Sequence, residues 1–104
     1  MLYQRMTLKW DDSRLRIVVL NTRRHRRLGL RDPVIRSCIL SARSIQTFGM
    51  NSSIGVAWIT NKGTVAKRII MQPNRLAVGP TAIVVESLDP DDLPPQGTVL
   101  TVHP

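Results

Sequence analysis

The sequence contains a single cysteine, Cys38, and this scarcity excludes an intrachain disulfide. His25 and His103 are the two histidines, so the four thiolate or imidazole ligands of a structural zinc site are lacking. The apolar neighbours Ile39 and Leu40 predict that Cys38 is a buried structural thiol. We therefore expect a domain that is held together by packing alone, with no metal and no other cofactor.

Long apolar runs are also missing. No stretch approaches the length of about 20 apolar residues that a membrane-spanning helix needs. Residues 1–6 lack the apolar region of a secretory signal, and together with the unpaired thiol this predicts a cytoplasmic location. A chain of 104 residues is long enough for one compact domain and too short for two, so residues 1–104 are expected to form a single domain.

Strong helix formers are scarce. The chain has 5 alanines, 3 lysines and 1 glutamate, against 9 isoleucines, 10 valines and 8 threonines. This inventory suits pleated, half-buried surfaces and predicts an all-β fold, a compact small β-sandwich or barrel-like domain of seven to eight short strands. The strands are expected at residues 2–10, 14–19, 37–42, 45–48, 54–60, 64–71, 81–87 and 98–102.

Turn residues separate most of these segments. Asp11-Asp12-Ser13 is expected to join the first two strands in a hairpin, and Asn61-Lys62-Gly63 is a second hairpin signal. Asp32-Pro33 indicates a turn. Residues 89–95 contain three prolines, which remove ladder donors, so this segment is expected to be a surface loop with at most one helical turn.

One short helix is expected near residues 23–28. Thr22 is a suitable N-cap, and Gly29 stands where a left-handed residue would end the helix. Arginines fill its first turn, where positive charge opposes the helix dipole unless an anion or a carboxylate offsets it. This mismatch is a local hint of function.

Acidic residues are few, and the charge is uneven. Residues 1–50 carry the whole net charge of +8, while residues 51–104 balance to zero. Arginine outnumbers lysine 12 to 3, which favours planar, bidentate contacts with carboxylate or phosphate. The predicted anion-binding residues are Arg23, Arg24, Arg26, Arg27, Arg31 and Arg16. The same charge also fits a face that is merely solvated.

Aromatic residues are too few and too dispersed for a stacking platform. Tyr3, Trp10, Phe48 and Trp58 are the four, and sequence-specific reading of nucleic acid is therefore disfavoured. Alternation along the strands instead predicts a buried core that includes Phe48, Ile54, Val56, Trp58, Val84 and Leu100.

The order of several motifs resembles that of a prokaryotic protein family. The motifs are Arg-Arg-x-Arg-Arg-Leu-Gly-Leu at 23–30, Gln-Thr-Phe-Gly-Met at 46–50, the strand 54–58, Asn-Lys-Gly at 61–63, Pro73 and Val-Val-Glu at 84–86. Over roughly residues 14–102 the chain resembles the domain-of-unknown-function 192 family. The resemblance implies a compact β-sandwich-like domain and no established reaction, ligand or cofactor.

The chain departs from the family pattern at two positions that are usually acidic. Gly55 stands where the family usually has an acid in the strand after Gly-Met, and Gly97-Thr98 replaces the usual Gly-Asp. If those acids serve a site, this chain has lost part of it, because glycine and threonine supply no carboxylate. An enzymatic role is correspondingly less favoured.

The segment Thr47 to Gly55 lies between strands and offers glycines, an amide and hydroxyls for a small-ligand cleft. The candidate cleft residues are Thr47, Gly49, Met50, Asn51, Ser52, Ser53, Gly55 and Glu86. A purely structural turn is the alternative, since glycine is often needed only for backbone geometry. The sequence shows neither a nucleophile motif nor a phosphate loop, and Asp89, Asp91 and Asp92 indicate a solvated turn more than a calcium loop.

Two functions therefore stay open at the level of sequence. The first is non-enzymatic binding of an anionic partner, protein or nucleic acid, through the basic N-terminal half. The second is a small-molecule-binding or vestigial enzymatic domain that uses the segment Thr47–Gly55, in which case the charge is incidental. The sequence identifies neither the partner nor the oligomeric state.

Overall fold

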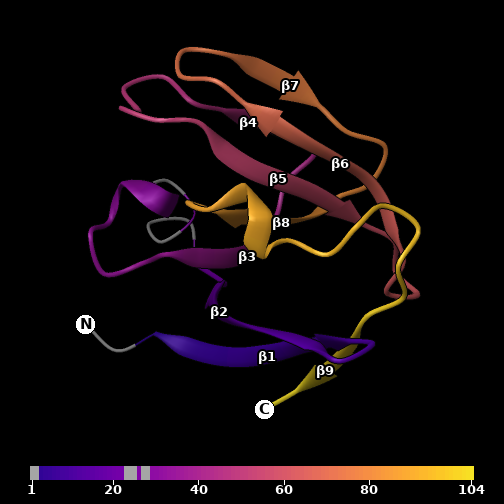
Figure 1. The fold of residues 1–104 in the computed structure, drawn as a ribbon. Helices are drawn as coiled ribbons and strands as arrows, with labels where there is room; N and C mark the ends of the chain where they lie inside the picture. Colours follow the sequence, from indigo (N-terminus) through magenta and orange to yellow (C-terminus); the bar gives the residue numbers. More distant parts are fainter. Residues whose placement is uncertain (1–2, 23–25, 27–28) are drawn as a thin grey trace.

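The structure, a computed structural model, describes residues 3–22, 26 and 29–104 (Figure 1). The strands in these ranges are β1 (Gln4–Trp10), β2 (Ser13–Leu20), β3 (Ser37–Ser41), β4 (Ser44–Gln46), β5 (Ile54–Ile59), β6 (Val65–Met71), β7 (Leu76–Val78), β8 (Ile83–Ser87) and β9 (Thr101–His103). Two short 3-10 helices accompany them, η1 (Gly29–Arg31) and η2 (Pro90–Asp92). The predicted all-β fold is confirmed. The helix expected near 23–28 lies, except for Arg26, outside the described residues.

Seven strands form one curled sheet in the order β6-β5-β8-β3-β2-β1-β9 (Figure 1). Neighbouring strands run antiparallel except for β2 and β3, which are parallel. The connection between this parallel pair holds η1 and residue 26. A separate ribbon of β4 and β7 pairs antiparallel and, as Figure 1 shows, lies apart from β1 and β2.

The C-terminal segment joins the two edges of the curled sheet. Leu100 N–H donates to the Gly63 carbonyl and Val65 N–H donates to the Thr98 carbonyl, each at 2.8 Å, beside the start of β6. A few residues later the same segment becomes β9 and pairs with β1. Because the residues that lead into the edge strand β9 also bond to β6 at the other edge, the sheet closes in the barrel-like manner that protects edge strands.

The sheet has a buried core on each face. The inner core, enclosed by the curl, contains Leu8, Trp10, Leu15, Ile17, Ala57, Ile59, Val65, Val85, Leu93 and Leu100. The outer core contains Val18, Leu20, Leu30, Ile35, Cys38, Leu40, Ile45, Ile54, Val56, Trp58, Met71 and Val84. It therefore draws on η1 and on the β4–β7 ribbon as well as on the sheet. All six residues of β5 are buried, which requires cover on both faces.

Trp58 fixes the ribbon on the outer face. Its side chain is completely buried, and its Nε1–H donates to the Arg43 carbonyl at 3.1 Å. Gly79 N–H donates to the same carbonyl at 2.8 Å. A Cβ at Gly79 would lie 2.0 Å from the indole Cε2, so only glycine lets the chain pass this close to the ring.

The core prediction is confirmed at five positions and wrong at one. Ile54, Val56, Trp58, Val84 and Leu100 are buried. Phe48 is 54% exposed, because it follows the end of β4 in a turn. There the Gln46 side-chain carbonyl accepts from Phe48 N–H at 2.7 Å and directs the chain away from the sheet.

The predicted turns are confirmed. The hairpin of β1 and β2 turns through Asp11 at φ 49°, and that of β5 and β6 through Gly63 at φ 90°. Gly29 has φ 49°, the left-handed conformation expected of it, and Ile35 N–H donates to the Asp32 carbonyl across the next turn. The unpredicted strand, β7, has only three residues, and no clear period can show in so short a segment.

The proline-rich segment 89–95 contributes to the core although it was expected only at the surface. Asp89 caps η2 by accepting from Asp91 N–H, so the predicted helical turn is present. Beyond it, Leu93 is 3% exposed and Pro94 is fully buried. Residues Pro90 and Leu93 pack directly over Gly55, where a Cβ would lie 2.8 Å from the Pro90 Cα and 2.6 Å from the Leu93 Cδ1. Position 55 therefore has no room for a side chain.

We predict that Gly55→Asp strongly destabilises the fold. The new carboxylate would displace η2 and would be buried without a partner, at a combined cost of roughly 3 kcal/mol or more. Urea unfolding of the variant and of the exposed control Ser52→Asp measures this cost, and the control is expected within about 0.5 kcal/mol of the parent. A Gly55→Asp variant as stable as the control would show that the position tolerates an acid and would revive the idea of a lost carboxylate.

Candidate functional site

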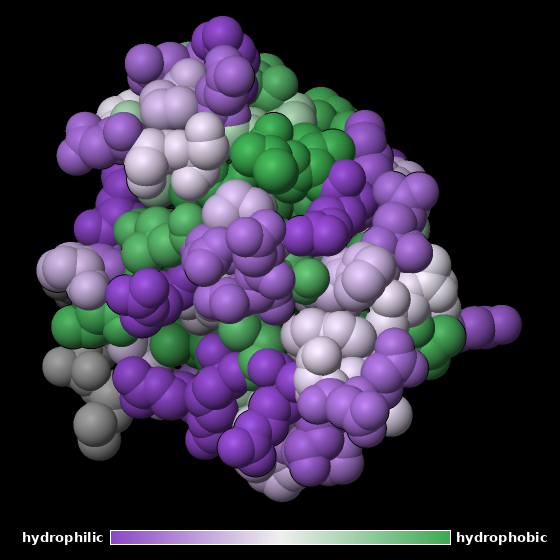
Figure 2. Space-filling model, viewed as in Figure 1, coloured by the Kyte–Doolittle hydropathy of each residue, from purple (hydrophilic) through white to green (hydrophobic). Residues whose placement is uncertain are grey.

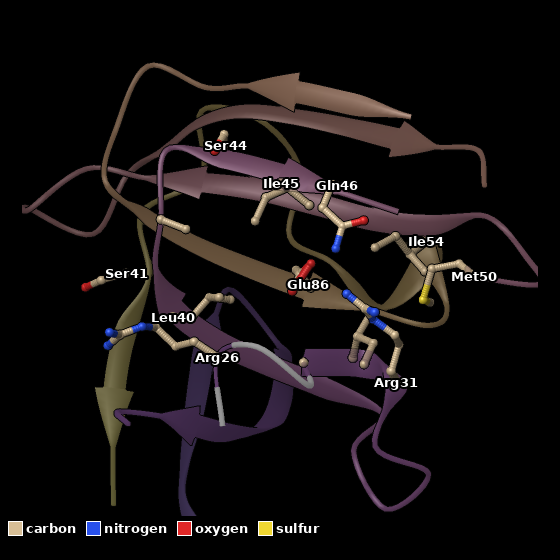
Figure 3. Close-up of a pocket in the computed structure, with 13 residues that line it drawn as sticks. Arg26, Arg31, Leu40, Ser41, Ser44, Ile45, Gln46, Met50, Ile54 and Glu86 are labelled. Atoms are coloured by element: carbon tan, nitrogen blue, oxygen red, sulfur yellow. The ribbon is translucent and has the colours of Figure 1, made fainter. Parts of the chain in front are cut away.

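A cavity of about 390 Å³ opens on the outer side of the sheet, between η1, β3, β4 and β8 (Figure 3). Its apolar walls are formed by Leu30, Leu40, Ile45, Met50 and Ile54. Its polar lining comes from Glu86 together with Arg26, Arg31, Ser41, Ser44 and Gln46. The cavity lies where η1 and the β4–β7 ribbon cover the outer core incompletely, so its floor is the sheet itself.

Glu86 is the polar group at this floor. It projects from β8 on the same face as Val84, and the register of the sheet sets it beside Cys38 of β3. Glu86 is 7% exposed, and the Cys38 thiol donates to its Oε1 at 3.7 Å. A Cβ at Gly29 would lie 3.8 Å from the same oxygen, so the backbone of η1 runs close over the carboxyl.

Burial controls the ionisation of this pair. It raises the pKa of Glu86 from 4.5 to about 7, although the bond from Cys38 and the positive charge of Arg31 both act to lower that pKa. Burial, followed by the nearby charge of Glu86, raises the pKa of the Cys38 thiol well above its usual value. At neutral pH the carboxyl is therefore divided between its two forms, and the thiol stays protonated.

Two arginines and an amide stand around the opening. Arg26 and Arg31 are both exposed at the rim, and Arg31 belongs to η1, which also covers Glu86. Figure 3 shows Glu86 near the centre, with the Arg31 guanidinium and the Gln46 amide to one side of it. Arg26 lies on the opposite side, near Leu40. The cavity thus combines a cationic rim, an apolar wall and a carboxyl floor.

The six arginines that the sequence predicts as anion-binding residues do not all lie at one described site. Arg26 and Arg31 line the cavity. Arg16 lies on β2, where its Nη1 donates to Thr7 Oγ1 at 2.9 Å, and it lines a different hollow. The remaining three, Arg23, Arg24 and Arg27, lie outside the described residues. One continuous patch of all six stays a prediction.

Only two of the eight predicted cleft residues line the cavity. Met50 and Glu86 line the cavity, and the other six, Thr47, Gly49, Asn51, Ser52, Ser53 and Gly55, do not. Thr47 is fully buried, with its hydroxyl donating to the Gln72 carbonyl at 2.6 Å and accepting from Arg75 N–H at 2.9 Å. It attaches the end of β4 to the connection between β6 and β7, which is a structural role.

Most of the residues that line the cavity are not predicted by the sequence patterns. Ser44 and Gln46 come from β4 and Leu30 from η1, elements that are distant in the sequence. The contact of Cys38 with Glu86 depends on the register of β3 and β8. One signal was present, because the single glutamate of the chain ends the apolar run 83–85. A charged residue that continues a buried strand is seldom there for packing alone.

Metal binding has no support in the described ranges. Over residues 3–22, 26 and 29–104, no three histidine, cysteine, aspartate or glutamate side chains gather closely enough to hold an ion. Nor does any helix in these ranges have the length and apolar character needed to cross a membrane.

We predict that Glu86 makes the stability of the fold depend on pH. Folding raises the pKa of Glu86, so the folded state holds the carboxyl proton more tightly than the unfolded state does. The contribution of Glu86 to the free energy of unfolding is therefore largest below pH 4.5. This contribution is lost as the pH rises from 4.5 through about 7, and the total loss is about 3 kcal/mol. Glu86→Gln removes the titration, and its stability relative to the parent should rise by a similar amount between pH 5 and pH 8.

Chemical unfolding of both proteins across this pH range measures the difference. Comparison with the variant removes the contributions of His25, His103 and the other acids, which both proteins share. A constant difference between parent and variant over the range would show that Glu86 titrates normally and is not buried as described.

Comparison of the chain with protein-family models, with curated proteins and with solved structures found no match. Membership of the domain-of-unknown-function 192 family therefore stays a prediction from the sequence motifs. The function proposed for the cavity rests on its geometry and chemistry.

Proposed function

We propose that this domain binds a small organic anion in the cavity and does so without chemical turnover. The observation that carries the proposal is a buried carboxyl, Glu86, on the floor of a 390 Å³ cavity whose rim holds Arg26 and Arg31. A cavity of this size lies within the usual range for small-molecule sites, which are mostly apolar with a few convergent polar groups.

The ligand class follows from the lining. Arginine presents a planar fork of donors that matches carboxylate and phosphate, so the anionic group of the ligand is assigned to Arg31, with Arg26 available at the other end of the opening. Leu30, Met50 and Ile54 contact the apolar body of the ligand. At the floor, the protonated form of Glu86 donates to an acceptor atom of the ligand.

Glu86 and Arg31 couple ligand binding to a proton. The charge of Arg31 lowers the pKa of Glu86, which burial has raised to about 7. An anion bound to Arg31 offsets this effect and adds its own negative charge, so it raises the pKa of Glu86 further. Binding therefore takes up a proton near neutral pH, and by linkage the affinity increases as the pH falls through this range.

Binding is favoured over catalysis. Cys38 is the nucleophilic side chain nearest to Glu86, and burial raises the pKa of its thiol, which keeps it unreactive. An acid at position 55 would face η2 and not the cavity, so the proposal needs no lost carboxylate. Recognition of an anionic protein or nucleic acid by the arginines of residues 23–31, and a cytoplasmic location, stay predictions from the sequence.

We predict that benzoate and phenyl phosphate bind in the cavity and that benzamide, which has no charge, binds at least ten-fold more weakly. Amide chemical shifts in an NMR titration should move at Gly29–Arg31, Gln46, Met50 and Glu86. Arg31→Ala should weaken benzoate by roughly ten-fold to a hundred-fold, the value of a charge-assisted hydrogen bond. Arg36→Ala is the matched control, because Arg36 is also exposed and lies outside the cavity, and it should leave the affinity unchanged.

Two further measurements sharpen this test. The affinity of the parent for benzoate should increase from pH 8 to pH 6, and in Glu86→Gln this dependence should disappear. Equal binding of benzoate and benzamide, or equal losses in Arg31→Ala and Arg36→Ala, would contradict recognition of an anion at this cavity.

A further inference from the structure

The hairpin of β1 and β2 presents a basic face on the side of the sheet that points away from the inner core. Arg14 and Arg16 of β2 lie opposite Lys9 and Thr7 of β1 in the antiparallel register. On the other side of β1, His103 of β9 pairs with Thr7. Together with Pro104, these five residues line a shallow hollow of about 490 Å³.

The alternation of side chains along β1 and β2 places the basic residues on one face. Leu8, Trp10, Leu15 and Ile17 point into the inner core and are buried, so their neighbours along each strand point outward. Lys9, Arg14, Arg16 and His103 are exposed. Figure 2 shows hydrophilic residues grouped over the lower part of the molecule, where Figure 1 places β1, β2 and β9.

The arrangement of charge on this face is unfavourable for the isolated domain. Lys9 and Arg14 are direct cross-strand partners, and like charges in such pairs destabilise a sheet. Within the described part of the chain, Lys9, Arg14 and Arg16 have no ion pair with a carboxylate. The Thr7 hydroxyl instead accepts from Arg16 Nη1, which holds that guanidinium over the hollow. An anionic partner would relieve the repulsion.

The chemistry of the face favours one class of partner. Protein interfaces depend on buried aromatic or apolar anchors, and the exposed large apolar residues lie elsewhere, at Val34, Phe48, Ile70, Leu76, Val78, Val99 and Val102. Val102 of β9 is opposite Leu8 and lines a cavity on the inner side. No phenylalanine, tyrosine or tryptophan of the described residues lines the hollow. The face therefore lacks the row of large aromatic rings on which the bases of a single strand stack. Repeated phosphates on a duplex need only cationic donors.

We propose that the β1–β2–β9 face binds the phosphate backbone of a nucleic-acid duplex without reading its base sequence. Lys9, Arg14 and Arg16 contact phosphates, and the Thr7 hydroxyl orients Arg16 for its contact. The site shares no lining residue with the cavity of Glu86, so it is independent of the function proposed above.

Fluorescence anisotropy with labelled DNA and RNA duplexes of about 20 base pairs, over a series of salt concentrations, tests the proposal. The triple variant Lys9→Ala, Arg14→Ala, Arg16→Ala should bind at least ten-fold more weakly, and its salt slope on DNA should fall in magnitude by about 0.9 per lost phosphate contact, near 2.7. The matched control Arg36→Ala, Arg43→Ala, Lys62→Ala loses the same charge from exposed positions elsewhere and should keep both affinity and slope.

An NMR titration of the parent with the same duplex does not depend on the folding of any variant. Shifts confined to the amides of β1, β2 and β9 support the proposal, and binding by either duplex supports it. Equal losses in the two triple variants, tighter binding of a single strand than of the duplex, or competition by polyglutamate at equal charge would overturn it. Arg31→Ala should leave duplex binding unchanged, which separates this test from that of the cavity.

Discussion

Strand β5 sits within the large sheet with all of its residues buried, and this double burial constrains the rest of the structure. The inner side is enclosed because the sheet curls and the C-terminal segment, which forms the edge strand β9, also bonds to β6 at the other edge. The outer side cannot be covered by the curl, so a second layer is needed. The β4–β7 ribbon supplies it, seated on Trp58 where Gly79 leaves room for the indole. A substitution that lifts the ribbon would therefore expose the outer core.

The β4–β7 ribbon and η1 together cover the outer core, and the candidate site lies between them. The ribbon covers Trp58 and its neighbours, while η1 reaches over the carboxyl of Glu86 with the left-handed Gly29 at closest approach. The space that remains exposes the floor of the sheet to a ligand. Burial is what gives Glu86 its raised pKa, and Arg31 at the rim is what moderates it. The same packing that completes the core thus sets the chemistry of the cavity.

Local patterns in the sequence were sufficient for the fold class, the hairpins and the positions of most strands. Gly63 in the hairpin turn and Gly29 after the arginine-rich segment both have the positive φ that the sequence predicts for them. Contacts between distant segments were not accessible in this way. The family pattern predicts a lost acid at Gly55, but this glycine instead makes room for Pro90 and Leu93, which lie about 35 residues later in the chain. The pairing of Cys38 with Glu86 likewise follows from strand register, which single-sequence patterns do not specify.

The carboxyl of Glu86 is the group on which the cavity, its coupling to a proton and its choice of ligand all depend. A carbon-13 NMR titration of that side-chain carboxyl, in the full chain without ligand, measures its pKa directly. Since Glu86 is the only glutamate of the sequence, its resonance is distinguishable from those of the six aspartates. We expect a midpoint near 7, raised from 4.5 by burial beside Cys38. A midpoint near 4.5 would show that the carboxyl is solvated and would contradict the site described.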